Sequence, residues 1–110
     1  MNVALVPIGR DERDMRFLIR AGGRHAGGIT VHSVQGRSFS YGLAIAPDMR
    51  RQGVAHAALG LLFVQMHARG FTHAVVQVAP ENAASLALHL GLGFVKSACC
   101  GRAITLQKDL

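Results

Sequence analysis

The stretch Ser38–Ala55, SFSYGLAIAPDMRRQGVA, decides the fold. Its first part, Ser38–Ala46, reads as a β-strand, and Pro47 ends that strand because proline lacks the N–H that a sheet ladder needs. A basic turn with one glycine, Arg50–Gly53, then opens a helix. A strand that passes through such a turn into a helix predicts a domain of mixed α+β class.

The residues downstream predict a second strand and a second helix. The first helix closes at Gly70, and its apolar stripe is formed by Val54, Ala57, Ala58, Leu61 and Leu62. His73–Ala79 is a continuous apolar run, which suits a strand buried on both faces, and Pro80 ends it. Asn82 caps the second helix, which ends at Gly91 and Gly93. Its inward residues are expected to be Ala83, Leu86, Ala87 and Leu90.

The two ends of the chain predict further strands. Val3–Ile8 is expected to be an edge strand, because Pro7 lies within it, and the charged residues 9–14 connect it to the next strand. A hairpin follows, with strands Met15–Ala21 and His25–Ser33. At the other end, a closing hairpin joins the strands Phe94–Ala98 and Arg102–Lys108 around Cys100 and Gly101.

The resulting order is β-β-β-β-α-β-α-β-β in one domain over residues 1–110. The strands on either side of the first helix should be parallel. Pro47 and Pro80 stand at the carboxyl ends of these two strands, so we expect the strands to splay apart there. Clefts at carboxyl ends of strands are where α/β sheets bind ligands.

Composition limits the class of protein. The chain has 110 residues and a formal charge of +6, which fits one compact domain whose surface attracts polyanions. No window approaches the roughly 20 apolar residues of a membrane span, so we expect a cytoplasmic protein. The adjacent Cys99 and Cys100 form neither a zinc site nor a disulfide framework, and we expect reduced thiols.

The turn Arg50–Ala55 predicts an anion site. Exposed N–H groups and the positive end of the helix favour a phosphate, and Gly53 and Ala55 leave room for it near the backbone. The turn lacks the Lys-Ser/Thr ending of a P-loop and the three glycines of the dinucleotide fingerprint. The expected ligand therefore lies outside the common nucleotide classes.

Two segments resemble motifs of a known family. Ile45–Ala55 (IAPDMRRQGVA) resembles the acetyl-CoA loop of the GNAT superfamily of N-acetyltransferases, whose core is Arg or Gln, two residues, Gly, one residue, then Gly or Ala. Asn82–Phe94 (NAASLALHLGLGF) is similar to the second signature, an Asn-initiated helix that finishes in Gly-Phe. The resemblance covers residues 38–110 well and 15–37 loosely.

This resemblance implies an enzyme that transfers an acetyl group from acetyl-CoA, as cosubstrate and without a metal, to a primary amine by direct attack in a ternary complex. It implies that the pantetheine arm lies along the strand edge at Leu43, Ala44 and Ile45, and that Asn82 lies near it. The pyrophosphate would lie on the loop that starts at Arg50, against the amides of Arg51, Gln52, Gly53, Val54, Ala55 and His56.

The chain departs from the family pattern in three places. His89 occupies the position of a tyrosine that protonates the departing thiolate, and as a general acid it would need a raised pKa. No carboxylate offers a general base, so His32 and His73 are the candidates. The two helices that roof the acceptor side between the first two strands are absent, which leaves apolar sheet surface and favours homo-oligomers.

Two other functions remain open at this stage. The chain is a non-catalytic acyl-CoA-binding module if the acid, the base and the roof are all lost. A basic nucleic-acid-binding domain is the less favoured alternative, since five Phe, one Tyr and no Trp supply few stacking platforms. The acceptor itself is not revealed by the sequence.

Overall fold

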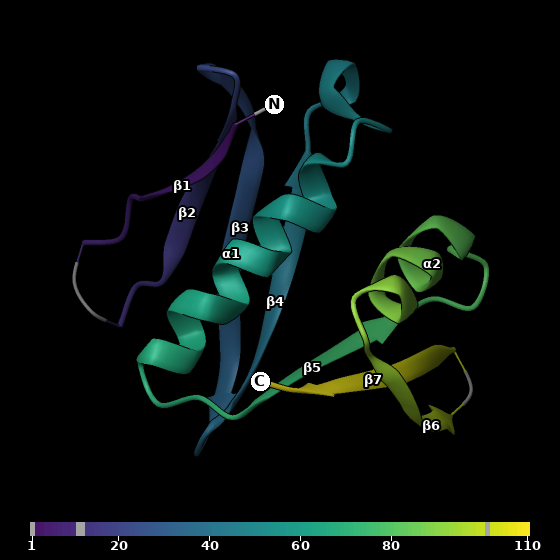
Figure 1. The fold of residues 1–110 in the computed structure, drawn as a ribbon. Coiled ribbons are helices and arrows are strands. Elements are labelled where there is room, and N and C mark those ends of the chain that lie inside the picture. Colours follow the sequence, from purple (N-terminus) through teal and green to yellow (C-terminus); the bar gives the residue numbers. More distant parts are fainter. Residues whose placement is uncertain (1, 11–12, 101) are drawn as a thin grey trace.

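In the computed structural model, which describes residues 2–10, 13–100 and 102–110, seven strands and two α-helices follow one another in the predicted order (Figure 1). The strands are β1 (Val3–Pro7), β2 (Arg16–Ala21), β3 (Arg24–Gln35), β4 (Ser38–Ile45), β5 (His73–Val78), β6 (Val95–Cys100) and β7 (Ala103–Asp109). The helices are α1 (Val54–Ala68) and α2 (Ala83–Gly91), and a 3-10 turn, η1 (Pro47–Met49), precedes α1.

The strands form one mixed sheet in the order β1-β2-β3-β4-β5-β7-β6. β4 and β5 run parallel, as predicted, and every other neighbouring pair is antiparallel. β1, which contains Pro7, lies at an edge, also as predicted. The order places β4 and β5 in the middle of the sheet, where the carboxyl ends of both strands point the same way.

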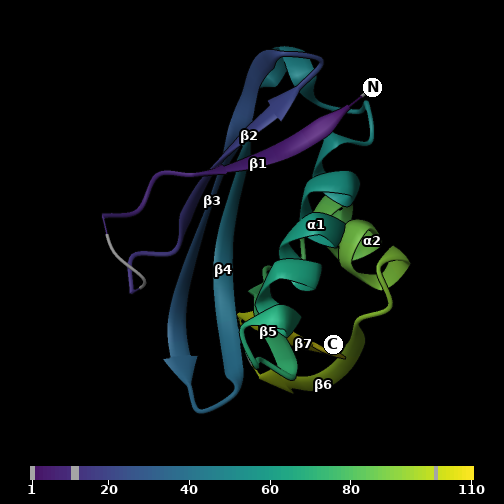
Figure 2. The ribbon, with the colours of Figure 1, turned by 60° about the vertical axis from the view of Figure 1, so that its left-hand side comes forward.

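Both helices lie on the same face of the sheet (Figure 2). The molecule measures 39 × 30 × 19 Å, and its smallest dimension corresponds to one sheet and one helical layer. The opposite face of the sheet has no layer of helices over it among the described residues (Figure 2). Every strand in this part of the chain therefore has only one covered face.

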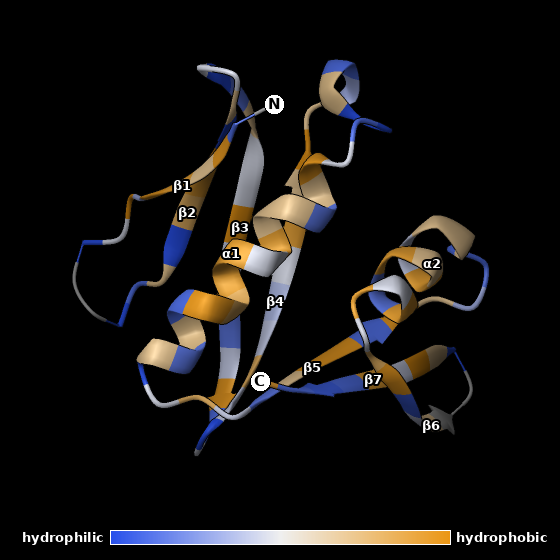
Figure 3. Ribbon diagram, in the orientation of Figure 1, coloured by the Kyte–Doolittle hydropathy of each residue, from blue (hydrophilic) through white to orange (hydrophobic). Residues whose placement is uncertain are grey.

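The core lies between α1 and the strands beneath it, where apolar residues concentrate (Figure 3). Its largest fully buried side chains are Phe17, Phe39, Ile19, Ile29, Leu59, Leu62, Met66, Leu106 and Val54. The predicted stripe of α1 was partly wrong, because Ala57 and Leu61 are exposed whereas Leu59 and Met66 are buried.

The prediction that β5 is buried on both faces was wrong. Its residues alternate, so that Ala74, Val76 and Val78 are buried while His73 and Gln77 are exposed. The reason is the missing second layer, since a strand of a two-layer domain has one face toward the helices and one toward solvent. The polar residues at both ends of the apolar run mark the solvent face.

α2 is also rotated relative to the prediction. Asn82 caps it as expected, since its Oδ1 accepts a hydrogen bond of 3.1 Å from the amide of Ser85. However, Leu90 is 55% exposed, and the side chain turned into the core is His89. Ala83 and Ala87 are exposed as well. The inward side of α2 therefore carries a histidine, which hydrogen-bonds to β4.

The uncovered face of the sheet is mixed, because it carries polar side chains as well as Leu18 and Val75. Strand alternation places Thr30, His32, Ser40 and Gln77 on this face, opposite the buried residues of the same strands. Polar side chains therefore interrupt the apolar surface that was expected on this part of the described chain. That surface was the reason for predicting a homo-oligomer, which stays a prediction without that support.

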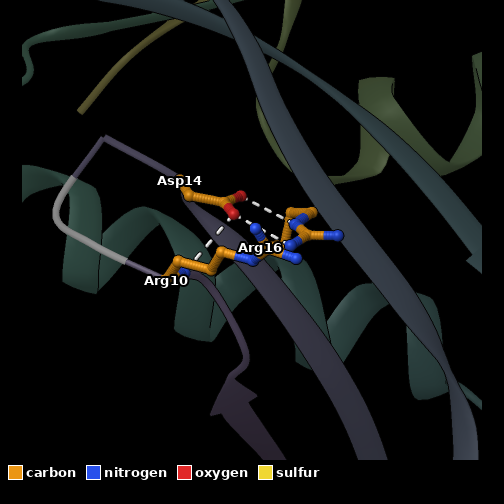
Figure 4. Close-up of polar contacts among 3 residues, drawn as sticks. All are labelled: Arg10, Asp14 and Arg16. Carbon is orange, nitrogen blue, oxygen red and sulfur yellow. Dashed lines mark hydrogen bonds and ion pairs between the residues drawn. The ribbon is translucent and has the colours of Figure 1, made fainter.

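In the connection between β1 and β2, the carboxylate of Asp14 accepts from three nitrogen donors of two arginines (Figure 4). Arg16 Nε and Nη2 donate to the two oxygens of Asp14 at 2.7 and 2.8 Å, and the Arg10 amide donates at 3.4 Å. The hydrogen bond from Arg16 holds the pKa of Asp14 below its usual value. A short ionic turn thus stands where the GNAT pattern has two helices.

Two sequence-based expectations fall partly outside the described residues. Cys99 and Cys100 end β6, but the structure describes neither side chain, and Gly101 of the predicted hairpin also lies outside it. In the part of the chain that the structure does describe, neither helix is long and apolar enough to cross a membrane.

We predict that the core between α1 and the sheet dominates stability. Leu59→Ala should lower the free energy of unfolding by about 2–5 kcal/mol, because Leu59 is fully buried and its loss leaves a cavity. Leu90→Ala, the same change at a 55% exposed site, should cost less than about 1 kcal/mol. Urea unfolding followed by circular dichroism measures both. Equal losses would contradict this description of the core.

A second prediction concerns the stability of the fold at acidic pH. Burial lowers the pKa of His89 from its usual 6.5, so below that pH the unfolded chain binds the proton more readily than the folded protein. The contribution of the neutral His89 to the free energy of unfolding is therefore complete above pH 6.5 and is lost as the pH falls toward the lowered pKa. Unfolding free energy between about pH 7.5 and 5.5 should fall less in His89→Gln than in wild type or in His67→Gln, an exposed control. Parallel curves for all three proteins would contradict the shift.

Candidate functional site

β4 and β5 part almost as soon as they begin. They pair only at Ser38 with His73 and at Phe39 with Ala74. Beyond this point β5 continues to pair with β7, whereas β4 keeps a partner only on the β3 side among the described residues. The predicted splay is therefore present, but it begins well before Pro47 and Pro80. The prolines end the strands and do not cause the separation.

The open edge of β4 carries backbone groups of alternate residues. The amide of Ala46 donates to the carbonyl of Ala26 in β3 at 2.7 Å, while the carbonyl of Arg37 accepts from Thr72 and His73 on the β5 side. Because successive residues of a strand point their backbone groups to opposite edges, Leu43 and Ile45 face the open edge and Ala44 faces β3. Of the three predicted strand residues, two are thus placed to bind a ligand through the backbone.

The loop between β4 and α1 has an unusual backbone. Arg51 and Gly53 both have positive φ, 62° and 76°. Gly53 is the N-cap residue of α1, in the left-handed conformation, and it offers no side chain to bind the first amides of the helix. The first helical amide with an acceptor is that of Ala57, which donates to the Gly53 carbonyl at 3.1 Å. Among the described residues, the amides of residues 51–56 have no acceptor.

The charges around this loop favour an anion. Arg50 donates from Nε to the carbonyl of Ile45 at 3.2 Å, which brings its guanidinium to the open edge of β4. The first turn of α1 contains no acidic residue, and Asp48 nearby pairs with Arg24 at 3.3 Å. The unpaired amides, the helix dipole and the loop residues Arg50 and Arg51 therefore all favour binding of a negatively charged group.

The strand residues predicted for the pantetheine arm and the loop predicted for the pyrophosphate lie at the same end of the sheet. Residues 51–56 follow β4 and η1 and lead into the first turn of α1, and the open edge of β4 presents Leu43 and Ile45. Val54, the first residue of α1, is buried, whereas Gln52 and His56 are exposed. Gln52 donates from its side chain to the carbonyl of Asp48 at 3.1 Å, which closes the turn.

His89 lies where β4 leaves β5, and it is only 5% exposed. Its Nδ1 is 2.7 Å from the carbonyl oxygen of Ser85, and its Nε2 is 2.9 Å from the hydroxyl oxygen of Tyr41. A carbonyl only accepts, so Nδ1 carries the proton. In a neutral imidazole Nε2 is then the acceptor, and Tyr41 donates to it.

Burial of His89 acts against the general-acid role predicted for it. A general acid would need a raised pKa, but burial lowers the pKa of His89 and keeps it neutral at pH 7. Burial also raises the pKa of Tyr41, which stays protonated. Sequence reasoning did not select Tyr41. Its one signal was the strand period, which puts it on the same face as Phe39, two residues before it.

A cavity opens on the uncovered face of the sheet, beside the point where β4 leaves β5. It has a volume of about 400 Å³. Its lining residues are His32, Ser33, Gln35, Ser38, Phe39, Ser40, Tyr41, Val75 and Gln77, and none of them is a carboxylate. His32, a candidate base, contacts Ser33 at 3.0 Å, whereas His73 pairs with Asp109 at 3.0 Å outside the lining.

Comparison with known proteins identifies the family. The profile of the acetyltransferase (GNAT) family matches residues 4–94. The [ribosomal protein bS18]-alanine N-acetyltransferase of Escherichia coli (strain K12) is 31% identical over 83 residues, which are 76% of this chain and 56% of that protein. The chain thus spans about half the length of the curated relatives it matches.

Solved structures agree with this result. The ribosomal-protein-S18-alanine N-acetyltransferase from Escherichia coli superposes with a TM-score of 0.72 at 26% identity, over 92% of this chain and 70% of that one. The PaiA N-acetyltransferase from Thermoplasma acidophilum, solved with coenzyme A, gives 0.78 at 14% identity, over 86% and 60%. At 14% identity, the similarity to the PaiA structure shows only that the two chains share a fold. The sequence match and the fold together establish that the chain belongs to the GNAT family of acetyltransferases.

Proposed function

We propose that this chain binds acetyl-CoA and transfers its acetyl group to a primary amine, which attacks the thioester directly in a ternary complex. The observation that carries the proposal is the open edge of β4 next to the unpaired amides that begin α1. A strand edge binds an extended chain through its backbone, and a helix start binds phosphate. Coenzyme A combines an extended pantetheine arm with a pyrophosphate.

The roles follow from this arrangement. The pantetheine arm lies against Leu43 and Ile45, with Asn82 of the opposite strand–helix junction on its other side. The pyrophosphate lies on the amides of residues 51–56, and Arg50 and Arg51 add positive charge. The loop supplies binding and orientation, so that the thioester carbonyl lies near the point where β4 and β5 separate.

The acceptor we propose is the amino terminus of a polypeptide. The relatives reported above are named for the acetylation of an alanine of a ribosomal protein. The uncovered sheet face supports the same class of acceptor, since the cavity lined by Ser40 and Gln77 opens where no helical layer of the described residues limits the length of an acceptor chain. A cytoplasmic location remains a prediction that accompanies this function.

We predict that backbone geometry matters more than side-chain charge for coenzyme binding. Gly53→Val should weaken coenzyme A binding at least about tenfold, because a β-branched residue is strained at a φ of 76° and turns the amides away. Arg51→Ala keeps those amides and should weaken it by less than about threefold. Isothermal titration calorimetry measures both.

The matched control for this experiment is Gly70→Val. Gly70 follows the other end of α1, also has a positive φ (95°), and has open space where a side chain would be added. It should show a comparable loss of stability with unchanged coenzyme A affinity. If Gly53→Val binds coenzyme A as tightly as Gly70→Val does, the proposed pyrophosphate site is wrong.

Acetyl transfer itself is tested with a short peptide that has a free amino-terminal alanine. We expect release of the coenzyme A thiol, detected with a thiol reagent, and an acetylated peptide in the mass spectrum. The same peptide with a formylated amino terminus is the control and should give neither. Binding of acetyl-CoA without thiol release with this peptide or a panel of amines would favour the non-catalytic acyl-CoA-binding module, which the carboxylate-free cavity also fits.

A further inference from the structure

The Tyr41–His89 pair occupies a particular place in the fold. Phe39 is the last residue of β4 that pairs with β5, and Tyr41 is the next residue on the same face. Tyr41 therefore stands at the bottom of the opening between the two strands. It contacts His89 on the helix side and is also one of the residues that line the cavity on the uncovered side.

The surroundings of the pair are apolar. The rings that contact Tyr41 and His89 belong to Phe39 of β4, Phe63 of α1 and Phe94 before β6. The polar contacts of the two side chains are with each other and with Ser85, whose carbonyl and hydroxyl oxygens lie 2.7 and 3.3 Å from His89 Nδ1. The only base that Tyr41 contacts among the described residues is thus His89.

The tautomer makes this contact directional. Nδ1 is occupied by the Ser85 carbonyl, so Nε2 keeps an open lone pair toward the Tyr41 hydroxyl. When Nε2 takes up a proton, the resulting imidazolium still donates from Nδ1 to Ser85. A histidine without that carbonyl could turn or change tautomer. Ser85 therefore fixes His89 as a proton acceptor toward β4.

We propose that Tyr41 and His89 form a proton-transfer pair for acetyl transfer, in which Tyr41 contacts the reacting atoms and His89 is the positioning residue behind it. This inference rests on the proposed function. As the amine forms its bond to the thioester carbon, a nitrogen proton passes to the Tyr41 oxygen and the Tyr41 proton moves to His89 Nε2.

The second half of the step returns both groups to their starting state. The carbon–sulfur bond breaks, Tyr41 gives a proton to the departing thiolate, and His89 Nε2 gives its proton back to the Tyr41 oxygen. One proton is thus lost by nitrogen and one is gained by sulfur, with no net change in the pair. The cavity has no carboxylate in its lining, and the pair supplies a proton acceptor from the helix side of the sheet, opposite the side on which His32 lies.

The first test observes the pair without an acceptor. Protein labelled uniformly with nitrogen-15, so that the histidine rings and the backbone amides are both observed, is titrated with acetyl-CoA and with desulfo-coenzyme A, and His89→Gln assigns the ring signals. We expect a protonated Nδ1 in the free protein, and a shift of the Nε2 signal with acetyl-CoA that desulfo-coenzyme A does not cause. Both ligands should shift the amide of Gly53.

The outcomes separate the two proposals. If the Gly53 amide shifts with both ligands while His89 Nε2 does not respond to acetyl-CoA, the proton-transfer pair is refuted and the coenzyme site stands. If neither signal moves at saturating acetyl-CoA, both proposals are refuted. Because this measurement uses wild-type protein, it does not depend on whether any variant folds.

The second test is kinetic and uses the peptide with a free amino-terminal alanine. Tyr41→Phe and His89→Gln should lower kcat at least about tenfold with coenzyme A affinity within about twofold of wild type. Gln accepts a hydrogen bond from Tyr41 but cannot hold the proton. If His89 has only a structural role, His89→Gln should therefore keep the wild-type kcat. His67→Gln and Ser97→Ala, exposed residues of α1 and β6, are the matched controls and should keep kcat. Wild-type kcat in Tyr41→Phe would overturn the inference.

Discussion

The site depends on the separation of β4 and β5 after two paired residues. A backbone amide or carbonyl that faces an open strand edge needs a partner, either water or a ligand chain. In this protein the open edge includes Leu43 and Ile45, and it ends directly in front of a helix whose first amides also lack acceptors. The open strand edge and the unpaired amides are therefore the two backbone features on which the proposed coenzyme site rests.

Local chemistry explains why much of this could be predicted from the sequence. Gly53 marks the left-handed turn, Pro47 marks the end of β4, and Asn82 marks the start of α2, and each of these residues acts within a few positions of itself. The element order and the parallel pair follow from such local signals. They are also the signals that carry the resemblance to the GNAT family, which the comparisons confirmed.

The features that the sequence did not reveal depend on contacts between distant residues. Which side of α2 faces the core is set by a single-layer helical arrangement, and it buries His89 instead of Leu90. The His89–Tyr41 hydrogen bond joins residues 48 positions apart, and no spacing rule connects them. The same absence of a second layer leaves His73 and Gln77 exposed on β5, although the run between them is apolar.

The most direct test of the account is amide hydrogen exchange on β4, followed by nuclear magnetic resonance with and without saturating coenzyme A. If the pantetheine arm binds as an added strand, the amides of Leu43 and Ile45 should exchange rapidly in the free protein and become protected in the complex. The amide of Ala44, which faces β3, should change little. Bound coenzyme A with unprotected Leu43 and Ile45 amides would contradict the account.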